Sequence, residues 1–94
     1  MLEEKISEEM LDELYEVLAA VDNKEDCREL LEDLCTYKEV AQMAQRIRAA
    51  KCLMEGKTYN MVIEETDISS ATLSRVSRAL KYGSGYKKQL KKLV

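Results

Sequence analysis

Proline, histidine, phenylalanine and tryptophan are absent from this 94-residue chain, and glycine occurs only three times. The lack of proline removes the usual helix breaker, and the lack of histidine removes the commonest general acid–base group. No apolar run approaches the roughly 18 residues that span a bilayer, and the acidic start MLEEKISEE lacks the basic region of a signal peptide. We therefore expect a cytoplasmic protein that has no membrane partner.

The cysteines give little sign of a metal site or a disulfide framework. Cys27, Cys35 and Cys52 are odd in number and show no CxxC spacing. Without histidine, a zinc site would need all three thiols and a carboxylate. Reduced, structural cysteines, no metal and no cofactor are therefore expected. No glycine-rich phosphate loop occurs and no acid, base and nucleophile converge, so an enzyme is not expected.

The composition predicts helices. Leucine, alanine and methionine, together with glutamate and lysine, are strong helix formers. A chain of this length buries only about 60% of its unfolded surface, so it builds one small core, which a partner subunit would enlarge. We predict an all-α single domain over residues 1–94.

Charge separates the two halves of the chain. Residues 1–40 hold fourteen acidic and four basic residues, a balance of −10, whereas residues 41–94 hold four and eleven, a balance of +7. After Asp67 there is no acidic residue, while seven lysines and arginines follow. This asymmetry suggests a surface for polyanions in the second half.

Capping residues and apolar periodicity predict the individual helices. Ser7 caps a first helix, Asn23 precedes a second with Cys27 and Cys35 on its apolar face, and Thr36 with Glu39 forms a capping box for a third. The third helix is expected to stop at Gly56, which suits a left-handed closing conformation. Short helices are predicted at 59–66 and in the tail, where Tyr86, Leu90 and Leu93 share a side, and a longer one at 70–82.

The helices at 59–66 and 70–82 are joined by three residues, as in a helix-turn-helix. Four apolar residues fall where such a unit needs contacts between its helices: Val62, Ile68, Leu73 and Val76. Asp67 takes the turn position usually held by glycine and tolerates a positive φ, whereas Ile63 replaces the usual small residue.

The second of these helices has two different faces. At 100° per residue, Leu73, Val76 and Leu80 point inward. The opposite face carries Ala71, Ser74, Arg75 and Arg78. Short side chains and arginine forks without carboxylates suit a helix in the DNA major groove, and Ser69 and Ser70 offer backbone N–H groups to a phosphate.

Residues 34–85 resemble the Trp repressor superfamily and, within it, the TrpR-like YerC/YecD family. The most specific segments are QRIRAAKCLMEGKTY and SSATLSRVSRALKYG. The resemblance implies an intertwined homodimer with dimerisation helices in 1–56, a helix-turn-helix reading head in 57–82 and a tail helix in 83–94. It implies a near-palindromic operator read by two heads roughly 34 Å apart.

The expected function is that of a sequence-specific, dimeric regulator bound to double-stranded DNA. Base contacts are assigned to Ser70, Ala71, Ser74 and Arg78. Phosphate contacts are assigned to Thr58, Tyr59, Asn60, Arg75 and Lys81, with Lys57 as a looser candidate.

The resemblance also implies a corepressor pocket, formed in the repressor by two arginines that clamp tryptophan. The matching positions here are Arg46 and Arg75, with Thr36 as a neighbouring contact. The small residue beside the second arginine is Val76 in this chain, and its inward side chain should fill the space of the indole. We therefore expect no tryptophan response and no small-molecule effector.

One alternative is a helical protein-interaction module, in which the acidic first half binds another protein and the hairpin only packs. Salt distinguishes the two, because DNA binding weakens by orders of magnitude between about 50 and 200 mM salt.

Overall fold

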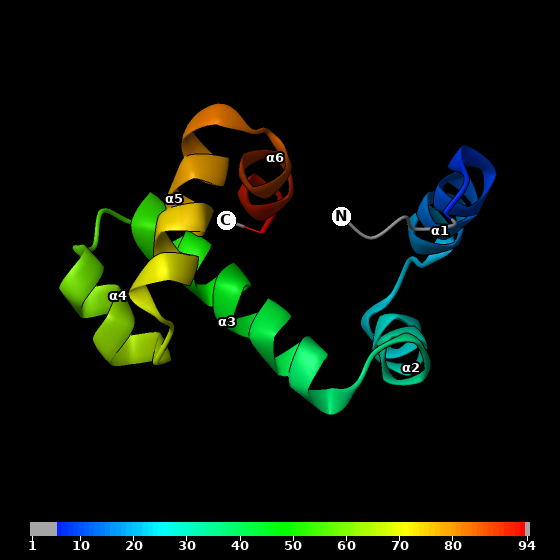
Figure 1. The fold of residues 1–94 in the computed structure, drawn as a ribbon, viewed down its shortest axis with the longest axis horizontal. Coiled ribbons are helices and arrows are strands. Elements are labelled where there is room, and N and C mark those ends of the chain that lie inside the picture. The colour runs from blue at the N-terminus through cyan, green and yellow to red at the C-terminus, as the bar shows by residue number, and fades with distance from the viewer. Residues whose placement is uncertain (1–5, 94) are drawn as a thin grey trace. The chain divides into compact units, whose positions relative to one another are not determined.

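The computed structural model describes residues 6–93, and every regular element in this range is an α-helix. The helices are α1 (Glu8–Ala20), α2 (Lys24–Leu34), α3 (Tyr37–Met54), α4 (Tyr59–Thr66), α5 (Ser70–Tyr82) and α6 (Gly85–Lys91). Figure 1 shows their order along the chain. The all-α prediction is confirmed, and the bounds at 59–66 and 70–82 are those expected from the sequence.

The chain divides into two compact units, Met1–Thr36 and Tyr37–Val94. The second unit contains α3 as well as the two helices of the expected reading head and the tail helix. A role for residues 1–56 in dimerisation stays a prediction.

The two helices of the first unit begin at side-chain caps. Ser7 Oγ accepts the N–H of Met10 at 3.1 Å, and Asn23 Oδ1 accepts the N–H of Asp26 at 2.8 Å. Each bond satisfies a backbone donor that has no partner inside the helix. The predicted starts of α1 and α2 are therefore confirmed.

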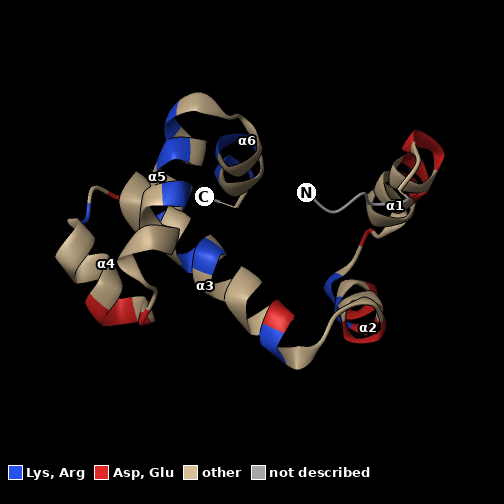
Figure 2. Cartoon of the chain, viewed as in Figure 1, with Lys and Arg blue, Asp and Glu red and all other residues tan. Residues whose placement is uncertain are grey.

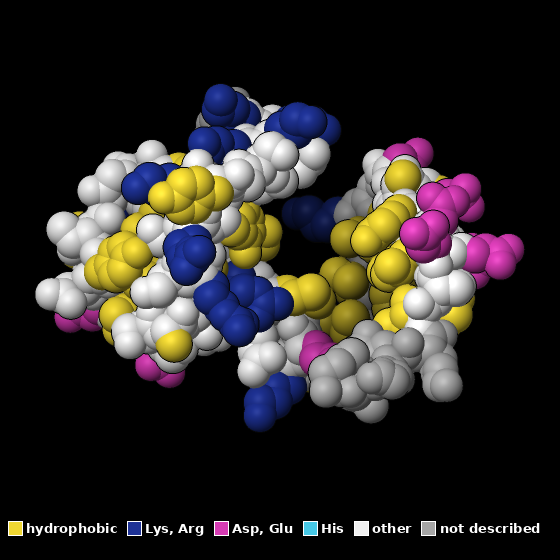
Figure 3. Space-filling model, turned by 45° about the horizontal axis from the view of Figure 1, so that its top comes forward, with side chains coloured by type: hydrophobic (Ala, Val, Ile, Leu, Met, Phe, Trp, Pro, Cys, Tyr) yellow, Lys and Arg dark blue, Asp and Glu magenta, His cyan; other side chains and the backbone are white. Residues whose placement is uncertain are grey.

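Neither α1 nor α2 has a buried residue in the structure. Large apolar side chains on α1 stay 36–59% exposed: Met10, Leu11, Leu14, Tyr15, Val17 and Leu18. Figure 3 shows hydrophobic side chains and carboxylates close together on the surface of this unit. The apolar stripe that the sequence predicts is present on α1, and packing within this unit does not bury it.

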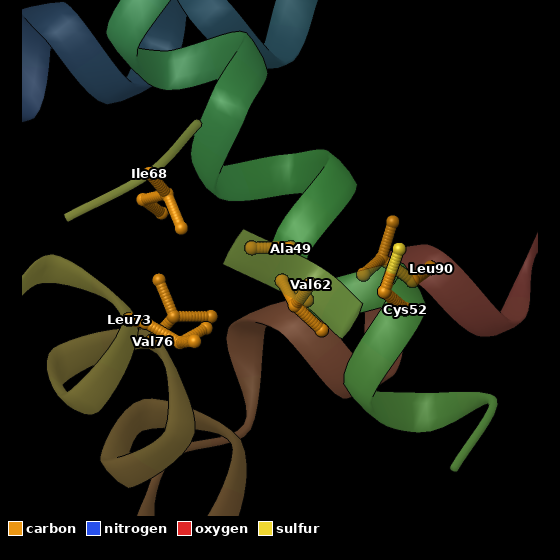
Figure 4. Packing of buried hydrophobic residues seen from close by; sticks show 8 residues of the cluster. Ala49, Cys52, Val62, Ile68, Leu73, Val76 and Leu90 are labelled. Atoms are coloured by element: carbon orange, nitrogen blue, oxygen red, sulfur yellow. The ribbon is translucent and has the colours of Figure 1, made fainter. Parts of the chain in front are cut away.

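The second unit has a small apolar core between its helices (Figure 4). Its buried members are Ala49, Ala50, Cys52, Val62, Ile68, Leu73, Val76 and Leu90. The central helix α3 packs against α4, α5 and α6, and α5 packs against both of its neighbours along the chain. The core therefore holds α5 from the side opposite to its serines and arginines.

The turn that follows α3 passes through Gly56, the residue at which the sequence predicted that this helix would stop. Its φ of +91° is left-handed, and the N–H of Lys57 bonds to the carbonyl of Cys52 at 3.1 Å. This arrangement satisfies a carbonyl of the last turn of α3.

The tail differs in part from the expectation. Leu90 is buried and Tyr86 packs partly against the core, but Leu93 is 73% exposed. The helix ends at Lys91, so Leu93 lies beyond its last turn and does not share the face of the other two.

The three cysteines are free thiols with different environments. Cys52 is buried, Cys35 is half-buried and Cys27 is exposed. The expectation of a packed thiol is met at Cys52, whereas Cys27 lies on the uncovered surface of α2. No cluster of three metal-ligating side chains and no helix able to cross a membrane occurs in residues 6–93.

Candidate nucleic-acid interface

Two capped helices and a tight turn form the predicted reading head. Thr58 Oγ1 accepts the N–H of Met61 at 3.3 Å at the start of α4, and Ser69 Oγ accepts the N–H of Thr72 at 3.2 Å at the start of α5. Asp67 ends α4 with φ 61° and ψ 21°, the left-handed conformation expected for it, and its N–H bonds to the carbonyl of Ile63 at 2.8 Å. Local sequence therefore specifies both helix starts and the turn.

The turn is held from two sides. Thr66 Oγ1 donates to the carbonyl of Val62 at 2.8 Å and accepts the N–H of Ile68 at 3.2 Å. Gln45, on α3, donates from Nε2 to the carbonyl of Thr66 at 3.0 Å. These bonds fix the path of the chain between the helices and connect it to α3.

The inward face of α5 is the predicted one. Leu73 and Val76 are at most 2% exposed and lie in the core beside Val62 and Ile68 (Figure 4). Leu80 packs partly against the same core. This inward packing decides which side chains of α5 face solvent.

The predicted base-contacting residues all lie on the exposed face of α5: Ser70, Ala71, Ser74 and Arg78. Arg75 and Lys81 are exposed as well. Within residues 6–93, neither Arg75 nor Arg78 forms an ion pair, and Lys81 stacks over the ring of Tyr82 at 5.4 Å. Figure 2 shows α5 with basic and no acidic residues. The face can therefore accept a polyanion without losing an internal salt bridge.

The first turn of α4 carries the other predicted phosphate contacts. Thr58, Tyr59 and Asn60 are exposed there. Thr58 is also the cap, and its oxygen accepts a backbone N–H while its hydroxyl hydrogen can still be donated.

One backbone amide in the first turn of α5, that of Thr72, is already bonded within the chain. Ser69 Oγ already occupies the N–H of Thr72, and it also bonds to the hydroxyl of Thr72 at 3.0 Å. The amides of Ser70 and Ala71 lie in the first turn, where a helix supplies no carbonyl partner. A phosphate would therefore meet these two amides rather than the whole first turn.

Of the three residues of the implied corepressor pocket, Arg46 lines a cavity beside the turn of the reading head. Arg46 lines a cavity of about 350 Å³, together with residues of α3, the turn and α5: Gln42, Gln45, Asp67, Ile68, Ser69 and Thr72. Arg75 is not among the residues that line it. Thr36 is exposed and ends the first compact unit. Val76 is 2% exposed, so its side chain fills core space as expected.

An ion-pair cluster at Glu65 was not predicted from the sequence. Glu65 accepts hydrogen bonds at 2.9 Å from Lys57 Nζ and from Arg48 Nη1. The bond from Lys57, then that from Arg48, lowers the pKa of the Glu65 carboxyl to about 2. Lys57 Nζ also lies 3.8 Å from Glu55 Oε1. Its ammonium is thus already paired, which makes it a weaker phosphate contact than the sequence suggested.

Comparisons with known proteins agree with this geometry. The profile of the Trp repressor protein family matches residues 9–94. The uncharacterised protein YerC of Bacillus subtilis (strain 168) is 40% identical over 81 residues, which are 86% of this chain and 78% of YerC.

Two solved structures share the fold. A Staphylococcus aureus protein assigned as a Trp repressor superposes with a TM-score of 0.86 at 35% identity, over 93% of this chain and 88% of its own. A TrpR-like protein of Eubacterium eligens ATCC 27750 superposes with a TM-score of 0.84 at 34% identity. The superposition covers 90% of this chain and 89% of the other protein. The profile match covers nearly the whole chain, and the chain therefore belongs to the Trp repressor family.

Proposed function

We propose that this chain is a sequence-specific DNA-binding transcriptional regulator that acts as a homodimer in the cytoplasm and has no catalytic role. The observation that carries the proposal is the outward face of α5. Its basic side chains are exposed, free of ion pairs among the described residues and backed by buried Leu73 and Val76. Membership of the Trp repressor family supports the same function.

The residues on the outward face of α5 are proposed to make two kinds of DNA contact. Ser70, Ala71 and Ser74 are short enough to bring the helix backbone close to base edges, and Arg78 can donate two hydrogen bonds to guanine. Arg75 and Lys81 are proposed to contact phosphates, which position the helix without reading sequence. Thr58, Tyr59 and Asn60 are proposed to contact the backbone from the start of α4.

The uncovered apolar surface of α1 supports the homodimer. Six large apolar side chains of this helix stay exposed in the single chain. Such a patch, flanked by charged residues, is typical of an interaction surface. Two-fold symmetry would then place two α5 helices in successive major grooves, roughly 34 Å apart, on a near-palindromic operator.

Tryptophan is not the proposed corepressor. Val76 occupies core volume, and Arg75 is not among the residues that line the cavity containing Arg46. We propose that DNA binding needs no small-molecule effector.

The test is a selection of bound fragments from a random duplex library, followed by titrations of the recovered duplex between 50 and 200 mM salt. Recovery of a palindrome, with affinity that falls by orders of magnitude over this range, is expected. A protein that recovers no common sequence and ignores duplex DNA in dilute buffer would instead be the helical interaction module.

A further inference from the structure

The tail helix α6 carries a group of basic side chains that the proposed reading of bases does not use. Four exposed lysines lie within its seven residues or directly after them: Lys87, Lys88, Lys91 and Lys92. None of them forms an ion pair within residues 6–93. Neither α5 nor α6 contains an acidic residue, so no carboxylate of these two helices competes for the ammonium groups.

The four lysines share the side of α6 that faces away from the core. Leu90 is buried and Tyr86 packs partly against the core. At about 100° per residue, these two side chains lie only about 40° apart on the helix. The lysines span an arc of about 140° on the other side, with Lys88 and Lys91 nearest its centre. These four residues form the lysine face of α6.

The lysine face is held in a fixed position relative to α5. The link between the two helices passes so close to α5 that a Cβ on Gly83 would lie 2.8 Å from the carbonyl oxygen of Ala79. The N–H of Gly83 bonds to the same oxygen at 2.9 Å, and the N–H of Lys88 bonds to the carbonyl of Ser84 at 3.0 Å. Both α5 and α3 pack against α6. The lysines are therefore carried on a packed helix and not on a loose tail.

The chain enters α6 from the end of the reading helix that lies towards the DNA backbone. In a helix-turn-helix, the N-terminal residues of the second helix contact base edges. The C-terminal end of α5, where Lys81 is exposed, is therefore the end further from the bases. Only Gly83 and Ser84 separate this end from α6. Figure 2 shows basic residues on both helices, so the basic surface continues from α5 onto α6.

We propose that the lysine face is a second DNA contact, which binds backbone phosphates beyond the base pairs that α5 reads. This inference rests on the proposed DNA-binding function and adds to it a surface outside the two helices of the reading head. A lysine ammonium is a point charge on a flexible stem, which suits a phosphate better than the bidentate recognition of a base. The rise from Lys88 to Lys91 is about 4.5 Å, close to the spacing of about 3.4 Å between phosphates along the axis of one strand. The two ammonium groups can therefore meet neighbouring phosphates.

A membrane and an acidic protein segment fit the lysine face less well than DNA. A basic helix that lies on an anionic membrane inserts its apolar side, whereas Tyr86 and Leu90 pack against the core of their own unit. Duplex DNA carries one negative charge per about 1.7 Å of its axis, a denser row of charge than the carboxylates of a helix supply. Pairing with protein carboxylates would also stabilise the protein without DNA, which distinguishes it from phosphate binding.

Removal of charge, with a matched control, tests the lysine face. One variant carries Lys88→Gln and Lys91→Gln. The control carries Lys24→Gln and Lys38→Gln, at exposed lysines of α2 and α3 that form no ion pair in the described part of the chain. On the selected operator, the slope of log K against log salt concentration should become shallower by about 2 per chain in the first variant, because each lost contact contributes about 0.9. The control has the same net charge and should keep the wild-type slope.

Ethylation interference locates the contacted phosphates, because ethylation removes the charge of one phosphate at a time. Ethylation at phosphates outside the base pairs that α5 reads should weaken binding of the wild type. The variant with Lys88→Gln and Lys91→Gln should be insensitive at the same positions and should keep the wild-type pattern elsewhere. Its preference for the operator over random duplexes should also be that of the wild type, since phosphate contacts carry no sequence information.

Three results would overturn the inference. One is an equal salt slope for the lysine variant and the control, and another is an unchanged ethylation pattern. The third is a fall in thermal stability without DNA that is larger for the lysine variant than for the control, which would show that the lysines pair with protein carboxylates. Wild-type protein that ignores duplex DNA would refute the proposed function as well, whereas the three results above refute only the contact at α6.

Discussion

Gln45 of α3 donates a hydrogen bond from Nε2 to the carbonyl oxygen of Thr66, 3.0 Å away, at the end of α4. The bond spans 21 residues of sequence and connects the scaffold helix to the turn between the two helices of the reading head. Because the same residue, Thr66, also holds Ile68, the path of the turn depends on this connection. These bonds thereby fix the position of the start of α5 relative to α3.

Gln45→Ala should lower the free energy of unfolding by about 0.5–1.5 kcal/mol, the usual net value of one hydrogen bond. Urea denaturation followed by circular dichroism measures the change. Gln42→Ala is the control, because Gln42 lies on the same helix and its side chain forms no hydrogen bond among the described residues. Equal losses for both variants would show that the bond to Thr66 does not stabilise the head.

The Glu65 cluster predicts an acid dependence of stability. The pKa of Glu65 is lowered to about 2 by Lys57 and Arg48, whereas an unperturbed glutamate titrates near about 4.3. A group whose folded pKa is depressed stabilises the fold above its unfolded pKa, and this stabilisation is lost as pH falls towards the folded pKa. The wild type should therefore lose stability between about pH 5 and pH 2.

Glu65→Gln should be less stable than the wild type at pH 7 and should show a shallower decline over that acid range. Glu64→Gln is the control. Glu64 is the exposed neighbour of Glu65 in the sequence, and it makes no ion pair within residues 6–93. Thermal denaturation at a series of pH values gives both slopes. A pH profile of Glu65→Gln that parallels the wild type would contradict the ion-pair account.

The division of the outward face into base and phosphate contacts predicts two different binding defects. Arg78→Ala should lose about 1–3 kcal/mol on the selected operator and relax the preference at one base pair. Lys81→Ala should weaken all duplexes alike and reduce the salt slope by about 1. Fluorescence anisotropy on specific and random duplexes measures both. The division fails if the two variants lose the same affinity on both kinds of DNA.

Burial of Val76 predicts that L-tryptophan does not bind. Isothermal titration calorimetry of the wild type should show no saturable heat at micromolar ligand. Val76→Ala provides a second measurement, in which weak binding would show that side-chain volume alone excludes the indole. Saturable heat with the wild-type protein would show that the pocket is open despite Val76.

Helix limits and the facing of α5 could be predicted from the sequence because both depend on local interactions. Ser7, Thr58 and Ser69 cap helices through bonds that span three residues. The inward and outward sides of α5 follow from the helical period, since Leu73 and Val76 recur at three residues and Arg78 does not fall on their side. These relations need no knowledge of the rest of the chain.

Contacts between elements could be decided only by the tertiary structure. Glu65 meets Arg48 across 17 residues of sequence and Lys57 across eight, and no pattern distinguishes these charges from others on solvated faces. The exposure of Cys27 and Leu93, on apolar faces by spacing, likewise depends on which neighbours are present to cover them. Periodicity predicts that a face is apolar, but burial requires a second surface, and only the arrangement of the helices supplies or withholds it.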